Sequence, residues 1–272
     1  MILQDIINII ESVAPLSYQE DWDNSGLQVG NRNAEIHEAL LTVDVTESVV
    51  NEAISLGCDL IISHHPLLFR GLKHLTGATP QERCVEKAIR HNIAIYSAHT
   101  SMDSYLHGVS GRMAQMLGVK DYRILVPSNT QSAAGLGVIG ALQQPMSHAD
   151  FLAHVAAVFA VEGAALRWVE GAHSEITTVA ICGGAGAEFV EQAIAQGADA
   201  FISADFKYHE LQSAYQRITV VDLDHWVSEH FTRDIFAQLL STHVPTRIAQ
   251  ADESPVRYYS PLTSHLSPKK EY

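Results

Sequence analysis

Short apolar runs alternate with amphipathic segments along most of this chain. Residues 40–45 and 58–63 are two such runs, and the helical pattern between them ends at Gly57. A short apolar run is typical of a buried strand, and a glycine just past a helix suits the left-handed position at the C-terminus of that helix. We therefore expect a strand, a helix and a second strand, arranged as a parallel pair with a right-handed crossover.

The same order of elements recurs in residues 179–203, where Gly197 stands in the place of Gly57. A third apolar run follows each copy, at residues 92–97 and 218–222. The residues shared by the copies are Ala53, Ile54, Gly57, Asp59, Ile62 and Ser63 in the first and Ala193, Ile194, Gly197, Asp199, Ile202 and Ser203 in the second. The repeat predicts two similar, interlocking α/β lobes with mixed, largely parallel sheets. A chance match of a common βαβ pattern is the alternative.

The segment between the two copies has a different pattern. It predicts a strand at residues 135–140, a helix that runs from Ser147 to residue 161, and a strand at residues 165–169. Ser147 is the expected N-cap, because a serine there can accept a hydrogen bond from the first turn of the helix. We expect this excursion to begin the second lobe.

The predicted lobes divide the chain into residues 1–127 plus 225–272 and residues 128–224. The first residues of the chain have the pattern of an amphipathic helix. The C-terminal stretch is polar and contains several prolines, and Tyr258 and Tyr259 are expected to add an edge strand before the end frays.

Composition narrows the classes of function. The 272 residues carry a formal net charge of −14, which argues against a nucleic-acid-binding surface because such a surface needs clustered lysine and arginine. The 15 histidines favour metal chemistry, whereas the 3 scattered cysteines form neither a disulfide framework nor a zinc motif. The N-terminus lacks the basic region and cleavage site of a signal peptide, and no apolar stretch reaches the roughly 18 residues of a membrane span. We expect a cytoplasmic protein with a small-molecule partner and no membrane or nucleic-acid partner.

Two adjacent histidines, His64 and His65, follow the apolar run 58–63 and precede Pro66. The neutral imidazole nitrogen is the commonest protein ligand for zinc, iron, nickel and cobalt. Proline has no N–H and a fixed φ, so it ends the strand directly after the pair. Both rings can then point into the space beyond the strand end, where open α/β sheets place their sites. The alternative is that one ring faces the core and the other faces solvent.

Two further motifs follow predicted parallel strands. Asp103 closes the motif that begins at His99, and His225 with Glu229 opens a helix that continues to Leu239. A histidine and a glutamate four residues apart lie on one helical face and can reach the same metal. Because parallel strands end on one edge of a sheet, these motifs should converge on two divalent ions about 3.5–4 Å apart, a pair suited to hydrolysis. The predicted ligands are His64, His65, Asp103, His225 and Glu229.

Each motif alone has a more ordinary interpretation. A lone pair of histidine and glutamate on a helix is usually a solvated surface pair, and Asp103 alone would usually form a loop turn. His99 could be a sixth ligand, or it could hold Asp103 or the substrate, and we favour the second role. The stretch Gly183–Gly186 could bind an anion, but we favour a packing turn because it lacks the lysine and the spacing of a phosphate loop.

Polar residues near these motifs are the remaining candidates for catalysis and substrate binding. Asp23 and Asn24 lie in a turn with Trp22, which could instead be a simple packing turn. Lys207 and His209 follow the second-copy strand, where they either bind substrate or lie on the surface. His209 is a candidate general acid because the ordinary pKa of histidine lies near neutrality. The substrate-binding candidates are Asp23, Asn24, Thr100 and Lys207, and the catalytic candidates are Glu229, His99 and His209.

In combination, these motifs resemble the Nif-three-like dinuclear-metal proteins, also called type-two GTP cyclohydrolase homologues. The motifs that carry the likeness are Trp22–Gly30, Ser63–Pro66, His99–Asp103, Ala180–Gly186, Ala204–His209 and His225–Glu229. They span nearly the whole chain in the family's order. The sequence departs from the family pattern at Ala204, Asp224 and Trp226. The extra carboxylate of Asp224 could orient His225 or disturb the start of its helix.

The resemblance implies a two-lobed α/β fold and a ring-shaped homohexamer with metal pairs facing an inner cavity. It gives ligand roles to the five residues already predicted, and two divalent metal ions per chain, with Zn, Fe, Mn, Ni and Co not distinguished. We expect a metal-dependent hydrolase acting on a small polar or nucleotide-like substrate, with ring opening of the GTP-cyclohydrolase type as one case. The alternative is a non-catalytic metal-binding protein, a metallochaperone or a regulatory interaction protein.

Overall fold

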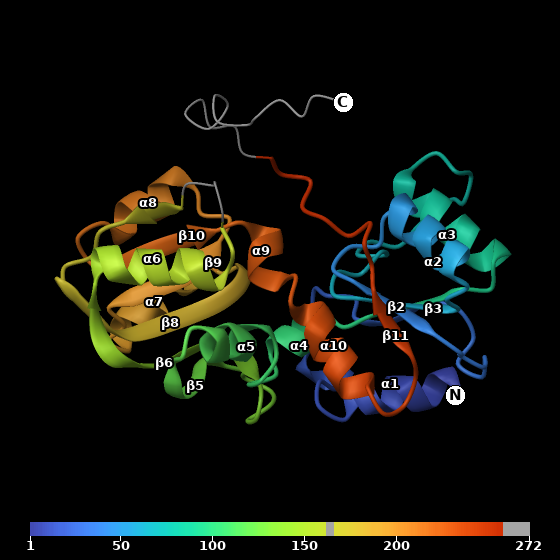
Figure 1. The fold of residues 1–272 in the computed structure, drawn as a ribbon, viewed down its shortest axis with the longest axis horizontal. Helices are drawn as coiled ribbons and strands as arrows, with labels where there is room; N and C mark the ends of the chain where they lie inside the picture. The colour runs from blue at the N-terminus through green and yellow to red at the C-terminus, as the bar shows by residue number, and fades with distance from the viewer. Residues whose placement is uncertain (162–165, 258–272) are drawn as a thin grey trace, which may run out of the picture.

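Two β-sheets lie side by side in the structure, a computed structural model that describes residues 1–161 and 166–257 (Figure 1). The five-stranded sheet has the order β1-β4-β3-β2-β11, and the six-stranded sheet has the order β5-β6-β8-β9-β10-β7. Both sheets are mixed, and helices pack against both. The α/β fold class that the sequence predicts is confirmed.

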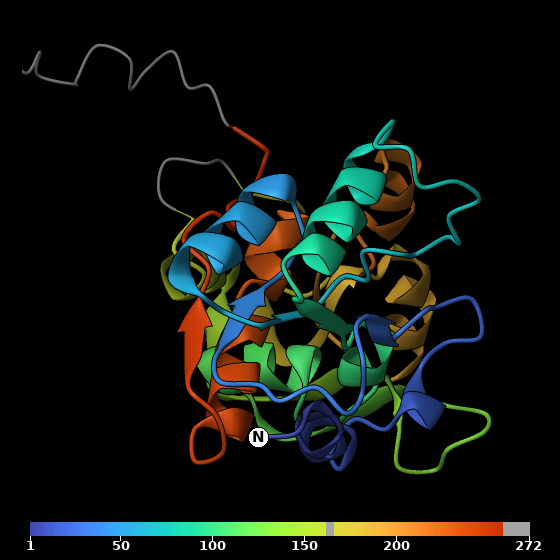
Figure 2. The same cartoon turned by 90° about the vertical axis from the view of Figure 1, so that its right-hand side faces the viewer.

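The first sheet has parallel strands at its centre. Its strands are β1 (Gly26–Val29), β2 (Ala39–Thr42), β3 (Leu60–Ser63), β4 (Ala94–Ser97) and β11 (Thr246–Ile248). Its helices are α1 (Leu3–Glu11), α2 (Glu47–Leu56), α3 (Pro80–Arg90), α4 (Thr100–Asp103) and α10 (Thr232–Leu240), with a 3-10 turn η1 (Leu16–Tyr18). Leu40 and Ile61 cluster with residues of α2 and α3, whereas Leu41 and Ile62 cluster with residues of α1 and α10. Helices thus cover both faces of this sheet (Figure 2), and this is why its strands are apolar on both faces.

The second sheet is also covered on both faces. Its strands are β5 (Lys120–Pro127), β6 (Gly135–Ser147), β7 (Arg167–Val169), β8 (Glu175–Ala185), β9 (Ala200–Ala204) and β10 (Thr219–Leu223). Its helices are α5 (Val109–Met116), α6 (His148–Val158), α7 (Val190–Ala195), α8 (Tyr208–Ala214) and α9 (His225–Glu229), with a 3-10 turn η2 (Ala187–Phe189). Ile181 clusters with residues of α5 and α6, and its neighbour Ala180 clusters with residues of α7 and α8.

The repeated pattern in the sequence corresponds to two βαβ units. The pairs β2–β3 and β8–β9 are parallel, and β4 and β10 continue the two parallel sets. Gly57 and Gly197 follow their helices with φ of 76° and 77°, as a left-handed helix end requires. Asp59 and Asp199 each accept hydrogen bonds from backbone N–H groups near the start of the preceding strand. The predicted parallel units are therefore confirmed.

Two strands, β5 and β11, are not where the sequence analysis expected them or were not expected at all. Strand β5 pairs with β6, so residues 120–127 belong to the second sheet although the lobe boundary was expected after residue 127. Strand β11 forms an edge of the first sheet, parallel to β2. With three residues it is too short for a periodic pattern to reveal. The edge strand expected at Tyr258 and Tyr259 lies outside the described residues.

The single helix predicted to run from His225 to Leu239 is divided into α9 and α10. The Ser228 hydroxyl donates to the His225 carbonyl oxygen at 2.7 Å, and the Thr232 hydroxyl donates to the Glu229 carbonyl oxygen. These side-chain hydrogen bonds compete with backbone N–H groups for the carbonyl oxygens, which bends or ends a helix. His225 and Glu229 still lie four residues apart on α9, so their common face is kept.

The amphipathic N-terminal helix is confirmed as α1, whose buried residues are Leu3, Ile6, Ile7 and Ile10. It packs near α10 on the first sheet (Figure 1). Among the described residues, none of the helices combines the length and the apolar composition that crossing a bilayer requires.

Candidate metal centre

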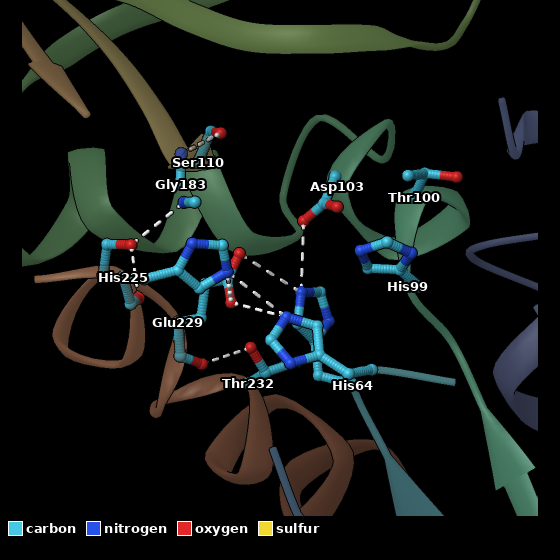
Figure 3. Close-up of polar contacts among 12 residues, drawn as sticks. His64, His99, Thr100, Asp103, Ser110, Gly183, His225, Glu229 and Thr232 are labelled. Carbon is cyan, nitrogen blue, oxygen red and sulfur yellow. Dashed lines mark hydrogen bonds and ion pairs between the residues drawn. The ribbon is translucent and has the colours of Figure 1, made fainter. Parts of the chain in front are cut away.

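Residues of both lobes meet where strand ends of the two sheets face each other. His64 and His65 directly follow β3, Asp103 closes α4 after β4, and His225 and Glu229 lie on α9 after β10 (Figure 3). Strands β2, β3 and β4 are parallel, so their C-terminal ends share an edge, and β9 and β10 likewise end together. The structure therefore brings the five predicted ligands into one cluster.

The Glu229 carboxylate lies in the middle of this cluster. Its Oε2 is 3.0 Å from His65 Nε2 and 3.1 Å from His225 Nε2, and its Oε1 is 3.6 Å from His64 Nε2. Asp103 Oδ1 lies 3.7 Å from His64 Nε2. The Nε2 atoms of His65 and His225 are 3.4 Å apart. All five side chains thus direct a potential ligand atom toward the same small volume.

The histidines are held in place through their other ring nitrogen. His64 Nδ1 lies 3.2 Å from the Ala98 carbonyl oxygen, and His65 Nδ1 lies 2.9 Å from the Asp44 carboxylate. His99 Nδ1 lies 2.8 Å from the Asp23 carboxylate, and His225 Nδ1 lies 2.7 Å from the Asp205 carboxylate. A carbonyl or carboxylate oxygen accepts, so each Nδ1 carries the proton and donates it. The Nε2 atom of each ring is then left for the centre, which is how proteins commonly orient imidazole ligands of metals.

His99 belongs to the cluster more closely than expected from the sequence. Among the described residues, two groups of three have ligand atoms within 4.8 Å of one another: His64 with His65 and His99, and His65 with His225 and Glu229. His99 is therefore a ligand candidate, although the sequence favoured a supporting role for it. Asp103 is in neither group, and its Oδ1 lies 3.7 Å from His64 Nε2. His65 is the residue that the two groups share.

Buried polar atoms without partners indicate that the cluster fits a cation. His64 Nε2, Asp103 Oδ1 and Glu229 Oε2 are buried and have no hydrogen-bond partner. The approach of His65 Nε2 to Glu229 Oε2 meets the distance of a hydrogen bond but not its geometry. Such an atom costs about 1–3 kcal/mol unless something satisfies it. Imidazole and carboxylate donors without sulfur suit Zn, Fe, Mn, Ni or Co, so these residues fit a divalent metal.

The charges of the cluster favour a cation as well. Burial would lower the pKa of His65, but the carboxylates of Asp44 and Glu229 outweigh it and raise that pKa to about 10. The contact with Glu229 raises the pKa of His225 to about 9. Burial would raise the pKa of Glu229, but His64 and the other two histidines hold it well below its usual value. The carboxylates thus hold protons on the histidines, and a divalent cation would displace those protons.

The glycine-rich end of β8 supports Glu229 from the second lobe. Gly184 has a φ of +63°, and a Cβ atom there would overlap Glu229 Oε1. The Gly184 N–H donates to Ser228 Oγ at 2.9 Å, and the Gly183 N–H donates to Ser110 Oγ at 3.2 Å (Figure 3). These close contacts agree with the favoured interpretation of this stretch as a packing turn.

Asp23 and Thr100 lie beside the centre and position His99. Asp23 Oδ1 accepts from His99 Nδ1 at 2.8 Å, and Asp23 Oδ2 accepts from Thr100 Oγ1 at 2.6 Å and from Ser25 Oγ at 2.8 Å. Burial would raise the pKa of Asp23, but these hydrogen bonds hold it far below its usual value. Asn24 Nδ2 donates to the Leu68 carbonyl oxygen at 2.6 Å. The recorded contacts of Asp23, Asn24 and Thr100, three of the four expected substrate-binding residues, are therefore internal ones.

Lys207 and His209 make their recorded contacts around α8 rather than in the metal cluster. Lys207 Nζ lies 3.8 Å from Glu210, and its side chain is 85% exposed. His209 Nδ1 lies 3.2 Å from Gln212 Oε1. Among the described residues, no recorded contact joins either side chain to the cluster. The geometry thus gives no support to the predicted substrate-binding role of Lys207 or the general-acid role of His209.

Asp44 and Asp205 are functional candidates that the sequence reasoning missed. Each follows a parallel strand at the edge where the predicted ligands lie, Asp44 after β2 and Asp205 after β9. The sequence did contain a signal for both, because a place just after a parallel strand is the same feature that identified the histidines. Asp224, which the sequence suggested could orient His225 or disturb the start of its helix, caps α9 by accepting from the Val227 N–H at 3.3 Å.

We expect Asp205→Asn to weaken metal binding by about 10–100-fold, the usual effect of losing a carboxylate that orients a histidine ligand. An amide is uncharged and can present its N–H to Nδ1, which favours the wrong tautomer of His225. Competition against a chelating dye would measure the affinity. Asp234→Asn removes the same charge from the exposed surface of α10 and serves as the control. Equal affinity in both variants would contradict the orienting role.

A cavity of about 280 Å³ opens onto His65 and His225. Arg167 lines it and pairs with Asp222 at 3.0 Å. Burial raises the pKa of Asp222 to about 6, although the guanidinium opposes this. Trp226 lines the same cavity. This opening gives small molecules a route to the second group of three ligand candidates.

Comparison with known proteins identifies the family of this chain. Residues 1–255 match the family model described as Duf34/NIF3 (NGG1p interacting factor 3). The chain belongs to the NIF3 family. A Clostridium perfringens protein named GTP cyclohydrolase 1 type 2 homolog is 36% identical over 84% of this chain and 87% of its own length. A Clostridium acetobutylicum protein of the same name is 34% identical over 84% of this chain and 85% of its own length.

A solved structure supports the same fold. The Bacillus cereus protein related to NIF3 matches with a TM-score of 0.86 over 95% of this chain and 99% of its own, at 24% sequence identity. The resemblance inferred from the motifs is therefore confirmed over most of the chain. Within this NIF3 fold, the histidine and glutamate cluster between the sheets is a candidate metal site.

Proposed function

We propose that this protein is a metal-dependent hydrolase that holds two divalent ions per chain and acts in the cytoplasm on a small polar or nucleotide-like substrate. The observation that carries the proposal is the cluster of His64, His65, His99, His225 and Glu229, which forms two overlapping groups of possible ligands and contains buried atoms without partners. Two ions held there would supply Lewis acidity and activate water for hydrolysis at neutral pH. Ring opening of the GTP-cyclohydrolase type is one case, supported by the names of the relatives.

The chain's own residues have distinct parts in this proposal. His64, His65, His225 and Glu229 would hold the ions, and Asp44 and Asp205 would keep two of the rings in their tautomers. Glu229 lies against three histidine nitrogens, so it would also hold or accept a proton near the reacting atoms. His99, fixed by Asp23, would face the substrate or serve as a further ligand. We call the group of His64, His65 and His99 the first subsite, and Asp103 Oδ1, which lies 3.7 Å from His64 Nε2, would complete it.

A second candidate function is metal binding without turnover, as in a metallochaperone or a regulator. The observation that favours it is that Lys207 and His209, the expected acid and substrate contacts, make their recorded contacts around α8. A hydrolase built on this cluster must therefore use His99 or Glu229 for proton transfer. A change at Glu229 should lower the rate of a hydrolase, whereas in a metal-binding protein it should lower only the metal content.

Glu229→Gln tests the proposal. We expect metal-loaded wild-type protein to hydrolyse p-nitrophenyl phosphate or to release formate from GTP. The variant should lose at least about 100-fold in rate per bound ion, a typical contribution of a general base. Elemental analysis gives the ions per chain, and Glu86→Gln, which breaks a surface ion pair with Arg90 on α3, is the control. If Glu229→Gln loses metal and the metal-loaded wild type shows no hydrolysis, the result would favour a metal-binding protein without turnover.

We also propose that the chain assembles as a toroidal homohexamer, which is supported by the motifs it shares with its family. Light scattering coupled to size-exclusion chromatography would measure the mass in solution. A monomer or dimer at micromolar concentration would contradict the hexamer.

A further inference from the structure

A second cavity, of about 310 Å³, lies between the loop that precedes β1 and the loop that joins β5 to β6. Its apolar surface includes Trp22 from the first loop and Phe189 from η2 in the second lobe. Its polar surface includes the carboxylates of Glu20, Asp21 and Glu188. A concave site of this size with aromatic walls and a few polar groups is typical of a small-molecule pocket.

This cavity shares a wall with the metal centre. Trp22 contacts the ring of His99 edge-on, with the ring centroids 6.0 Å apart. The Glu20 N–H donates to Thr100 Oγ1 at 2.9 Å, and Thr100 Oγ1 in turn donates to Asp23, the residue that holds His99. One short loop therefore both lines the cavity and fixes a ligand candidate. A molecule in the cavity would lie beside the first subsite.

Trp22 is the unusual element of this wall. Its side chain is 59% exposed, and it contacts Phe69, which is itself 45% exposed, at a centroid distance of 6.0 Å. Large aromatic side chains in such a position leave apolar surface in water, and this is typical of binding sites. A tryptophan face stacks on planar rings, and stacking favours any ring with a π-face over an aliphatic group.

The polar groups of the cavity select for hydrogen-bond donors. The lining contains three carboxylates and no lysine or arginine. Burial raises the pKa of Glu20, and the neighbouring Asp21 and Glu188 raise it further, so negative charge is crowded there. Carboxylates accept hydrogen bonds, and an anionic group placed among them would be repelled. A neutral ring with adjacent N–H groups would satisfy them.

We propose that this cavity binds a planar, nitrogen-rich ring with adjacent N–H donors, which stacks on Trp22 and donates hydrogen bonds to the carboxylates of Glu20 and Glu188. The inference deepens the proposed function and rests on it, because it names the part of the substrate that lies beside the metals. The reacting bond would then lie toward His99. Trp22 is a specificity-determining residue in this arrangement.

Binding of guanosine, adenosine and ribose to metal-loaded protein, measured by calorimetry, tests the inference. Guanosine presents two adjacent N–H donors that one carboxylate can accept, adenosine presents a single amino group, and ribose has no ring to stack. We expect guanosine to bind more tightly than adenosine, and ribose not to bind measurably. Trp22→Leu should weaken guanosine binding at least about fivefold. Glu188→Gln should reduce the preference for guanosine over adenosine while the metal content stays at the wild-type level.

Trp168→Leu is the matched control. Trp168 is an exposed tryptophan on β7, an edge strand of the second sheet, and it does not line the cavity. Unchanged guanosine binding in Trp22→Leu, or ribose binding as tight as guanosine, would overturn the inference. A lower oligomeric mass of Trp22→Leu would overturn it too, since the aromatic pair would then be a contact between copies.

The same samples separate this inference from the proposed hydrolase. If two ions bind and p-nitrophenyl phosphate is hydrolysed but guanosine does not bind, the cavity inference fails and the hydrolase stands. If guanosine binds through Trp22 but the protein has no hydrolytic activity, the cavity stands and the hydrolase fails.

Discussion

Replacing Gly184 with alanine should remove metal from the centre while the fold stays intact. Gly184 lies at the end of β8 with a φ of +63°, and a Cβ atom on it would overlap Glu229 Oε1 and approach His225 Cε1 to 3.5 Å. The Glu229 carboxylate is the end of a side chain, so it can move away where a backbone atom could not. The displaced carboxylate would no longer face His65 and His225. We expect at least about a tenfold loss of metal affinity, the lower limit for a disturbed ligand shell.

Gly197→Ala is the matched control for this variant. Gly197 has a φ of +77°, and a Cβ atom there would meet nothing within 4 Å. Both variants force alanine into the left-handed region, which costs roughly 1–2 kcal/mol of stability, but only Gly184→Ala disturbs Glu229. Thermal unfolding of metal-free protein would measure the shared cost, and elemental analysis would measure the metal. Similar metal content in the two variants would show that Glu229 does not need its present position.

The parallel core of the fold could be predicted from the sequence because its signals are local. Each βαβ unit has two apolar runs, an amphipathic segment and a glycine at the helix end, and these signals appear at Gly57 and Gly197. The short edge strand β11 could not be found in this way. Its three residues take their strand conformation from pairing with β2, a contact that joins distant parts of the chain.

The candidate ligands could be predicted for a similar reason. His64, His65, Asp103, His225 and Glu229 follow parallel strands, and the ends of such strands share an edge. The division between ligand and support could not be predicted, because it depends on ring orientation. Asp44 and Asp205 come from the same edges as the histidines, yet each lies on the Nδ1 side of its histidine.

The two halves of the repeat also contribute unequally to the site, and this explains why Lys207 and His209 make their recorded contacts around α8. The repeat suggested that residues after β9 would match the histidine pair after β3. In the first copy the strand is followed at once by His64 and His65, whereas in the second copy Asp205 has a φ of +60° and the chain turns into α8. Lys207 and His209 therefore follow the turn away from the centre, and Asp205 is the residue that reaches it.

Replacing His65 with alanine should empty both metal positions at once. His65 belongs to both groups of three ligand candidates, whereas His99 and His225 belong to one group each. Its one free nitrogen, Nε2, can bind a single ion, but that atom also lies 3.0 Å from Glu229 Oε2, and Glu229 Oε1 lies 3.6 Å from His64 Nε2. Loss of His65 would therefore remove one ligand and disturb the carboxylate that can reach both ions. We expect His99→Ala and His225→Ala to retain about one ion per chain and His65→Ala to retain almost none. Each bound ion stabilises the folded state, by about 2.7 kcal/mol when its free concentration is 100 times the Kd.

Two measurements on these three variants would check the shared role. Elemental analysis counts the ions, and thermal unfolding with and without a chelator shows how many contribute to stability. On chelation the wild type should lose the stabilisation from two ions, and His99→Ala and His225→Ala should each lose the stabilisation from one ion. His65→Ala should lose none. If His65→Ala kept one ion, the two subsites would be independent. Asp103, whose Oδ1 is buried without a partner beside His64, would then be the residue that completes the first subsite.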